Sequence, residues 1–182
     1  MTRPREVELV YASNGKPALA QRPGAADWRF NVSHSGEMAV YAFSRGHEVG
    51  IDVEAIRQVP DADAIVSGFF SRREQEAYLA LDPGEKMRGF FNCWTRKEAF
   101  VKALGGGLSH PLDGFDVSLA PREPARILRV GHMPGHEAGW CLDSFSPSPG
   151  FVAAVVAERH GPGFAAMNEQ FSDFQRDRRT VP

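Results

Sequence analysis

The chain has little cysteine, with two such residues among 182. Two cysteines exclude a disulfide framework, and a chain of this length does not need the single bridge that remains possible. We therefore expect Cys93 and Cys141 to be reduced, buried thiols in a cytoplasmic protein. No apolar run approaches about 18 residues, so the sequence predicts no transmembrane helix. The first six residues carry charges with no apolar stretch behind them, and we expect no signal peptide.

An excess of charge of either sign is also missing. The chain has 21 Lys and Arg against 23 Asp and Glu, for a formal net charge of −2. This balance excludes bulk electrostatics as the basis for binding nucleic acid or an anionic membrane, and we expect neither partner. With 42% hydrophobic and 24% charged residues, the composition is typical of a globular protein with one domain or two small ones.

The hydrophobic pattern predicts an α+β fold in which strands precede and follow a group of helices. Residues 38–43 and 48–54 are rich in strand formers and flank a short turn that contains Gly46, which predicts an antiparallel hairpin. A capping box at Ser71 and Glu74 predicts the start of a helix. Three glycines at 105–107 predict the end of the longest helix. We expect helices over 61–70, 72–81 and 85–104, and further strands over 29–34, 115–119, 126–130, 140–145 and 151–157.

A pair of acids two residues apart stands out in the segment Gly50-Ile51-Asp52-Val53-Glu54. On a strand, residues two apart point to the same face, so the carboxylates of Asp52 and Glu54 would lie side by side. Their mutual repulsion needs an offset, and a hard divalent cation supplies one. The alternative is a solvated strand end whose two acids bind nothing.

A second charged segment, residues 94–102, falls within the longest predicted helix. Glu98 and Lys102 are four residues apart and therefore share a helix face. One interpretation is an exposed salt bridge, which contributes only about 0.3–0.5 kcal/mol. The other interpretation is a helix that handles phosphate, which the neighbouring Arg96 and Lys97 favour.

The two segments together can build a site for magnesium and phosphate. Three carboxylates can supply oxygen ligands to one Mg²⁺ and leave other positions for water and phosphate oxygens. A lysine one helical turn further on would reach the same phosphates, and two more basic side chains would extend the positive region. These residues are Asp52, Glu54 and Glu98 as ligands, then Lys102, and then His34 and Lys16.

Six short motifs occur in order between about residue 8 and residue 160. With these motifs, the chain resembles the 4′-phosphopantetheinyl transferases of the surfactin-synthetase-activating type. The Gly-Ile-Asp-x-Glu and Trp-x-x-Lys-Glu-x-x-x-Lys elements are the most specific part of the resemblance. The motifs are Asn14-Gly15-Lys16-Pro17, Phe30-Asn31-Val32-Ser33-His34-Ser35, Gly50-Ile51-Asp52-Val53-Glu54, Phe69-Phe70-Ser71, Trp94-Thr95-Arg96-Lys97-Glu98-Ala99-Phe100-Val101-Lys102 and Gly105-Gly106-Gly107-Leu108-Ser109.

The resemblance implies an enzyme that moves the 4′-phosphopantetheine arm of coenzyme A to a serine of an apo acyl or peptidyl carrier protein. Such an enzyme depends on Mg²⁺ and releases 3′,5′-ADP. The implied Mg²⁺ ligands are Asp52, Glu54 and Glu98. Glu98 would also deprotonate the serine, directly or through water, and Lys102 would neutralise the pyrophosphate and assist the leaving group. The implied contacts to coenzyme A are Asn14, Gly15 and Lys16 in the nucleotide wall, and Ser33 and His34 at the 3′-phosphate.

The resemblance further implies a pseudo-two-fold pair of α/β lobes, with the first lobe shortened relative to the family. We expect a partial N-terminal lobe over residues 1–56, which is rich in β structure and carries coenzyme A and metal contacts. A C-terminal lobe over 57–160 and a polar, loosely docked tail over 161–182 would follow. The active unit would be a monomer or a dimer. Two rival functions use the same residues: a non-catalytic module that binds coenzyme A or a carrier protein, and a Mg²⁺-dependent pyrophosphate hydrolase.

Overall fold

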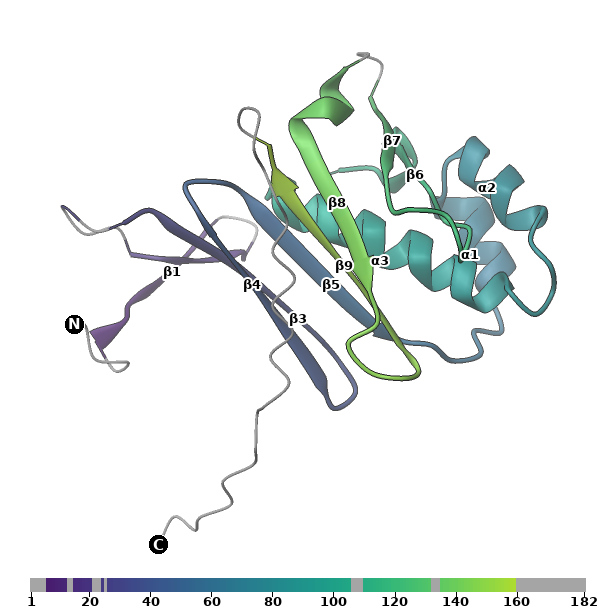
Figure 1. Ribbon diagram of the computed structural model, residues 1–182, viewed down its shortest axis with the longest axis horizontal. Helices are drawn as coiled ribbons and strands as arrows, with labels where there is room; N and C mark the ends of the chain where they lie inside the picture. The colour runs from purple at the N-terminus through teal and green to yellow at the C-terminus, as the bar shows by residue number, and fades with distance from the viewer. Residues whose placement is uncertain are drawn as a thin grey trace, which may run out of the picture.

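The computed structural model describes residues 6–12, 15–20, 24, 26–105, 110–131 and 135–159 of the chain. Within these residues, strands come first, three helices follow, and shorter strands and turns close the order, in agreement with an α+β fold (Figure 1). The strands are β1 (Leu9–Tyr11), β2 (Pro17–Leu19), β3 (Trp28–Ser35), β4 (Met38–Arg45), β5 (Val49–Ala55), β6 (Phe115–Val117), β7 (Ile127–Val130), β8 (Trp140–Phe145) and β9 (Phe151–Glu158). The helices are α1 (Ala62–Phe69), α2 (Arg72–Leu79) and α3 (Lys86–Leu104), with 3-10 turns η3 (Leu112–Gly114) and η4 (His136–Gly139).

The core is built on a three-stranded antiparallel sheet in which β9 lies between β5 and β8. Ala154 and Val156, on one face of β9, belong to the apolar cluster that includes α3. On the opposite face, Ile51 and Val53 of β5 join a second cluster with Val40 of β4. Strand β5 is therefore covered by helix α3 on one side and by the β3–β4 hairpin on the other, as Figure 1 shows.

Strands β3 and β4 form an antiparallel hairpin and pair along their whole length. Gly36 in its turn has a φ of +58°, which favours glycine. The expected pairing of residues 38–43 with 48–54 is wrong, because β4 pairs with β3 and β5 pairs with β9. A turn residue marks where the chain reverses, whereas buried faces decide which strands pair. Strands β5 and β9 are largely buried on both faces, but β4 exposes Tyr41 and Phe43 on one of its faces.

The helices follow the sequence pattern closely. The predicted capping box is confirmed: the Ser71 hydroxyl accepts a hydrogen bond from the Glu74 amide, and the Glu74 carboxylate accepts one from the Ser71 amide. Helix α3 ends at Leu104, and Gly105 follows it with a φ of +71°, so the predicted helix end is also confirmed. Gly106 and Gly107 lie outside the described residues.

The expected lobe boundary at residue 56 is crossed by the central sheet. Strand β5 lies before the boundary and forms hydrogen bonds with β9, which lies after it. The division of the chain into two lobes stays a prediction. The expected tail, residues 161–182, lies outside the described part of the chain.

Both cysteines carry free thiols, as predicted. Cys93 is fully buried in α3, but Cys141 of β8 is partly exposed, so the expectation of burial is wrong for Cys141. Among the described residues, no helix has the length and apolar character needed to cross a membrane.

Candidate active site

The site begins at a close approach between β5 and α3. Gly50 of β5 lies directly against the backbone of Ala99 and Ala103, two α3 residues that are fully buried. A larger residue at position 50 would keep the strand and the helix further apart. Glu98 and Lys102 precede these two alanines in the sequence, so this contact also brings Glu98 and Lys102 next to the strand.

Asp52 lies two residues after Gly50 and is 5% exposed. Its Oδ1 atom accepts hydrogen bonds from Lys102 Nζ at 2.7 Å and from Ser33 Oγ at 2.8 Å. Its Oδ2 atom is buried and has no hydrogen-bond partner among the residues described. Burial raises the pKa of Asp52 by more than the Lys102 ammonium and the Ser33 hydroxyl lower it. The unpartnered oxygen is the kind of ligand that a hard cation takes.

Lys102 links the helix to the edge of the sheet. Its Nζ atom also donates to Ser33 Oγ at 3.1 Å and to the Ile51 carbonyl at 3.3 Å. The side chain remains 29% exposed, although its ammonium group already has three hydrogen-bond acceptors within the protein. The interpretation of Glu98 and Lys102 as an exposed salt bridge is wrong, because the ion-pair partner of Lys102 is the buried carboxylate of Asp52.

Glu98 lies on the same face of α3 as Lys102, and it interacts electrostatically with Asp52 and Glu54. Burial raises the pKa of Glu98, and repulsion from Asp52 raises it further. Lys102 lowers this pKa, and Glu54 adds a smaller increase. A carboxyl group with a raised pKa is suited to accept a proton near neutral pH, because its conjugate acid is weaker than an ordinary carboxylic acid.

The third predicted metal ligand, Glu54, is bound from two sides. Its Oε2 atom accepts hydrogen bonds from Ser35 Oγ at 2.9 Å and from Arg57 at 3.2 Å. As they stand, no three His, Cys, Asp or Glu side chains in the described ranges are arranged to hold a metal ion. The donor chemistry nevertheless fits Mg²⁺, since all three candidates are carboxylates and Asp52 has an oxygen without a partner.

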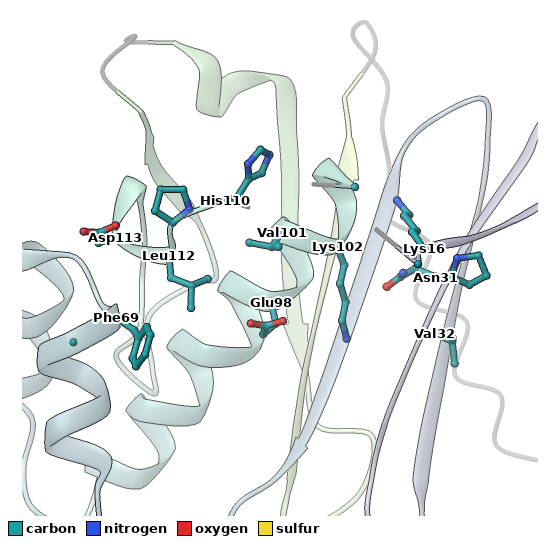
Figure 2. A pocket seen from close by; sticks show the side chains of 15 residues that line it. Lys16, Asn31, Val32, Phe69, Glu98, Val101, Lys102, His110, Leu112 and Asp113 are labelled. Atoms are coloured by element: carbon teal, nitrogen blue, oxygen red, sulfur yellow. The ribbon is translucent and has the colours of Figure 1, made fainter. Parts of the chain in front are cut away.

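The helix side of the site borders a cavity of about 640 Å³, a typical size for a small-molecule site, whereas Asp52 and Glu54 are not among the residues that line it. Glu98 and Lys102 of α3 line it from one side. Figure 2 shows that the remaining walls come from two separate regions of the fold. Lys16, Asn31 and Val32 lie on the side of the hairpin, and Phe69, Leu112 and Asp113 lie on the side of α1 and η3.

Three residues of the first predicted coenzyme A motif line the cavity wall, namely Gly15, Lys16 and Pro17. Asn14 lies outside the described residues. Lys16 Nζ is 3.0 Å from Glu48 Oε2 and donates to the Ala103 carbonyl at 3.4 Å. The lysine therefore also attaches the β1–β2 region to the end of α3.

Ser33 and His34 point to opposite faces of β3. Ser33 is 7% exposed, and its hydroxyl is bonded to Asp52, Val53 and Lys102. His34 is exposed and is not among the residues that line the cavity. A contact of either residue with a 3′-phosphate stays a prediction, and the hydroxyl of Ser33 already has partners within the protein.

Arg96 and Lys97 do not line the cavity, so they do not support the interpretation of α3 as a helix that handles phosphate. Lys97 is fully buried, with Nζ 2.8 Å from the Glu74 carboxylate, and it also donates to the Leu112 and Phe115 carbonyls. Arg96 is 3% exposed and donates to Ser118 and Ser144. Both side chains fasten α3 to its neighbours.

Sequence reasoning missed two groups of residues at this site. Asn31 and Ser35 hold β5 through their side chains, and their signal was the alternation of polar residues along a predicted strand. Phe69, Leu112 and Asp113 form the far wall of the cavity. They come from separate elements that only the folded chain brings together. Phe69 belongs to one of the six motifs, but no local pattern marks Leu112 or Asp113.

Comparisons with known proteins identify the family. The family model of the 4′-phosphopantetheinyl transferase superfamily matches residues 48–156, which include β5, α3 and β9. The 4′-phosphopantetheinyl transferase HetI of Nostoc sp. is 34% identical over 158 residues, covering 87% of this chain and 63% of the relative. The 4′-phosphopantetheinyl transferase Sfp of Bacillus subtilis is 35% identical over 152 residues, covering 84% of this chain and 63% of the relative. The chain thus spans a little under two thirds of the length of these relatives.

Among solved structures, holo-[acyl-carrier-protein] synthase of Thermotoga maritima aligns with a TM-score of 0.45 at 22% identity. The alignment covers 61% of this chain and 62% of that chain, and a score this low does not by itself assign a fold. The family model is the decisive match, because it covers more than half of the chain and includes both acid-bearing segments. The chain belongs to the 4′-phosphopantetheinyl transferase superfamily.

Proposed function

We propose that the protein transfers the 4′-phosphopantetheine arm of coenzyme A to a serine hydroxyl of an apo acyl or peptidyl carrier protein and releases 3′,5′-ADP. The observation that carries this proposal is the meeting of β5 and α3 at a cavity. Asp52 and Glu54 on the strand and Glu98 and Lys102 on the helix combine three acids with one partly exposed cation. The full-length relatives bear the name of this activity.

The reaction is a phosphoryl transfer, which depends more on positioning and charge neutralisation than on covalent catalysis. Asp52, Glu54 and Glu98 would hold Mg²⁺. When bound, this ion supplies positive charge that offsets the pyrophosphate of coenzyme A. The unpartnered Oδ2 atom of Asp52 and the mutual repulsion of the carboxylates support such an ion.

Two residues have roles of their own in this reaction. Lys102 reaches the cavity as a cation and would neutralise charge on the departing 3′,5′-ADP. Glu98, with its raised pKa, would accept the proton of the carrier serine. The serine oxygen then forms a bond to the phosphorus that carries the pantetheine arm, and the bond from this phosphorus to the ADP oxygen breaks.

The cavity offers space for part of coenzyme A between Lys16 and the wall at Phe69. We propose that Asn14, Gly15 and Lys16 flank the nucleotide. Contacts of Ser33 and His34 with the 3′-phosphate belong to the same proposal, as does a pseudo-two-fold relation between the hairpin and the region around α3. Free cysteines agree with the cytoplasmic location that we also propose.

The test is an intact-mass assay of apo carrier proteins from fatty acid, polyketide and peptide synthesis, incubated with the protein, coenzyme A and Mg²⁺. We expect the mass of at least one carrier to increase by one phosphopantetheine arm. Removal of the metal with EDTA, or replacement of the carrier serine by alanine, should abolish the increase. Failure of every carrier to gain mass would refute the proposal, and binding of coenzyme A without transfer would favour a non-catalytic module.

A matched pair of variants tests the site itself. Glu98→Gln keeps the shape of the side chain and removes its charge, and we expect a loss of transfer of at least about 10²-fold, because both a ligand and a base are removed. Glu76→Gln is the control, since Glu76 is exposed on α2 and, within the described part of the chain, forms an ion pair only with Arg72. Equal activity of the two variants would show that Glu98 has no part in the reaction.

A further inference from the structure

Two serines of β3 make the same pair of hydrogen bonds to β5. The Ser33 hydroxyl accepts from the Val53 amide at 3.3 Å and donates to Asp52 Oδ1 at 2.8 Å. The Ser35 hydroxyl accepts from the Ala55 amide at 3.1 Å and donates to Glu54 Oε2 at 2.9 Å. Each serine therefore binds one amide of β5 and the carboxylate of the residue just before that amide.

Asn31 continues the series towards the start of β5. Its Oδ1 atom accepts a hydrogen bond from the Ile51 amide at 2.9 Å. The amides of residues 51, 53 and 55 are thus bound by side chains at positions 31, 33 and 35, two residues apart on both strands. The backbone of β3 pairs with β4, and its side chains take the place of a backbone ladder along this edge of β5.

We infer that Ser35 is a positioning residue that orients the Glu54 carboxylate for a divalent cation, with Ser33 in the equivalent role at Asp52. This inference rests on the proposed function, because that function assigns Glu54 as a metal ligand. The O–H donor of Ser35 fixes one oxygen of Glu54 and leaves the other oxygen free to bind a cation. Loss of a hydrogen-bond partner that orients a metal ligand commonly lowers the affinity for the metal by about 10–100-fold.

Substitution of Ser35 tests the positioning role more directly than substitution of Ser33. Asp52 is held by Lys102 as well as by Ser33, so loss of one hydroxyl leaves its Oδ1 bound. The other partner of Glu54 is Arg57, whose side chain is 59% exposed and lies towards solvent. Without the Ser35 hydroxyl, the Glu54 carboxylate would turn towards Arg57, away from the position in which β3 holds it.

A purely structural role for Ser35 is the competing explanation, and Ser118 provides the matched control. Ser118 is a buried serine whose hydroxyl accepts from the Arg126 amide at 2.9 Å and donates to the Pro124 carbonyl at 2.9 Å. It resembles Ser35 in binding one amide and one oxygen, but its acceptor is a carbonyl, and its hydroxyl also accepts a hydrogen bond from Arg96. Ser118→Ala therefore removes the same kinds of hydrogen bond, and the one from Arg96 in addition, away from Asp52 and Glu54.

The experiment titrates Mn²⁺, as a spectroscopic substitute for Mg²⁺, into the full chain in the presence of coenzyme A, and measures free Mn²⁺ by electron paramagnetic resonance. We expect Ser35→Ala to raise the dissociation constant of Mn²⁺ about tenfold or more. Ser35→Thr, which keeps the hydroxyl, should stay close to the wild-type value, and Ser118→Ala should as well. Hydrogen exchange at the Ala55 amide, expected to accelerate in Ser35→Ala only, reports loss of the intended contact.

Each outcome separates this inference from the proposed function. Equal Mn²⁺ affinity of Ser35→Ala and the wild type, or an equal loss in Ser118→Ala, would overturn the positioning role. A wild-type protein that binds no Mn²⁺ would overturn it together with the metal site. If the wild type modifies no carrier but the Mn²⁺ difference persists, the proposed transfer is wrong and the positioning role stands.

Discussion

The substitution Gly50→Ala tests the contact on which the site is built. A Cβ atom added at Gly50 would lie 2.0 Å from the Ala99 carbonyl oxygen, 2.4 Å from the Ala103 amide nitrogen and 3.0 Å from the Ala103 Cα atom. All three are backbone atoms in the last two turns of the longest helix, so no rotation of a side chain can relieve the overlap. Either α3 or β5 must move.

The size of the effect follows from the overlap. Ordinary contacts with a Cβ atom begin near 3.4 Å, so α3 and β5 would have to separate by roughly 1 Å or more. Overpacking of a core costs about 1–3 kcal/mol, and the rigidity of the opposing backbone places Gly50→Ala at the upper end. For a chain of this length, about 3 kcal/mol corresponds to a decrease in Tm of roughly 6–12 °C. A displacement of about 1 Å between catalytic groups can also lower the rate of transfer about 10²-fold.

Gly68→Ala is the matched control for this experiment. Gly68 lies inside α1, and a Cβ atom added there would meet nothing within 4 Å. Because alanine favours helix more than glycine does, we expect Gly68→Ala to be more stable by about 0.5–1 kcal/mol. Thermal unfolding followed by circular dichroism and the carrier mass assay measure both variants. A Tm for Gly50→Ala within about 2 °C of the wild type, with transfer retained, would refute the reasoning.

Four further predictions concern single residues. Lys97→Met leaves the buried Glu74 carboxylate unpaired and should lower the free energy of unfolding in urea by about 3–5 kcal/mol; a loss below about 1 kcal/mol would contradict a buried ion pair. Burial and neighbouring acids raise the pKa of Glu98 in the protein without metal, so NMR of the metal-free protein should show a carboxyl group that titrates above the ordinary range, and Glu98→Gln should lack this titration. His34→Ala should raise the KM for coenzyme A more than that for dephospho-coenzyme A, and equal increases would exclude a 3′-phosphate contact. Burial raises the pKa of Tyr78 to about 12, so Tyr78→Phe should remove the highest-pH component of the tyrosinate absorbance titration.

The parts of the fold that were predictable depend on neighbouring residues. The capping box at Ser71 and the left-handed Gly105 mark helix ends through interactions within one turn of helix. The spacing of Asp52 and Glu54 determines that they share a strand face, whatever the strand pairs with. These features follow from local geometry, and the structure places them as the sequence predicted.

The parts that were not predictable depend on residues far apart in the sequence. The partner of β5 is β9, about 100 residues further along the chain, and the local turn at Gly46 favoured β4 instead. The burial of Lys97 depends on Glu74 and on the carbonyls around η3, which no pattern within α3 reveals. A charged residue within a helix has the same local signal whether it faces solvent or a buried partner.

Steric contact and charge have separate roles in this site. The distance between β5 and α3 is set where Gly50 meets Ala99 and Ala103, all of them uncharged. Asp52 and Lys102 form their ion pair across a gap that this contact has already fixed. Charge in the site can therefore be rearranged, as binding of a cation and a pyrophosphate requires, without a change in the distance between strand and helix. The fixed distance also explains why the motif begins with glycine: the acids need an adjacent residue small enough to let the helix approach.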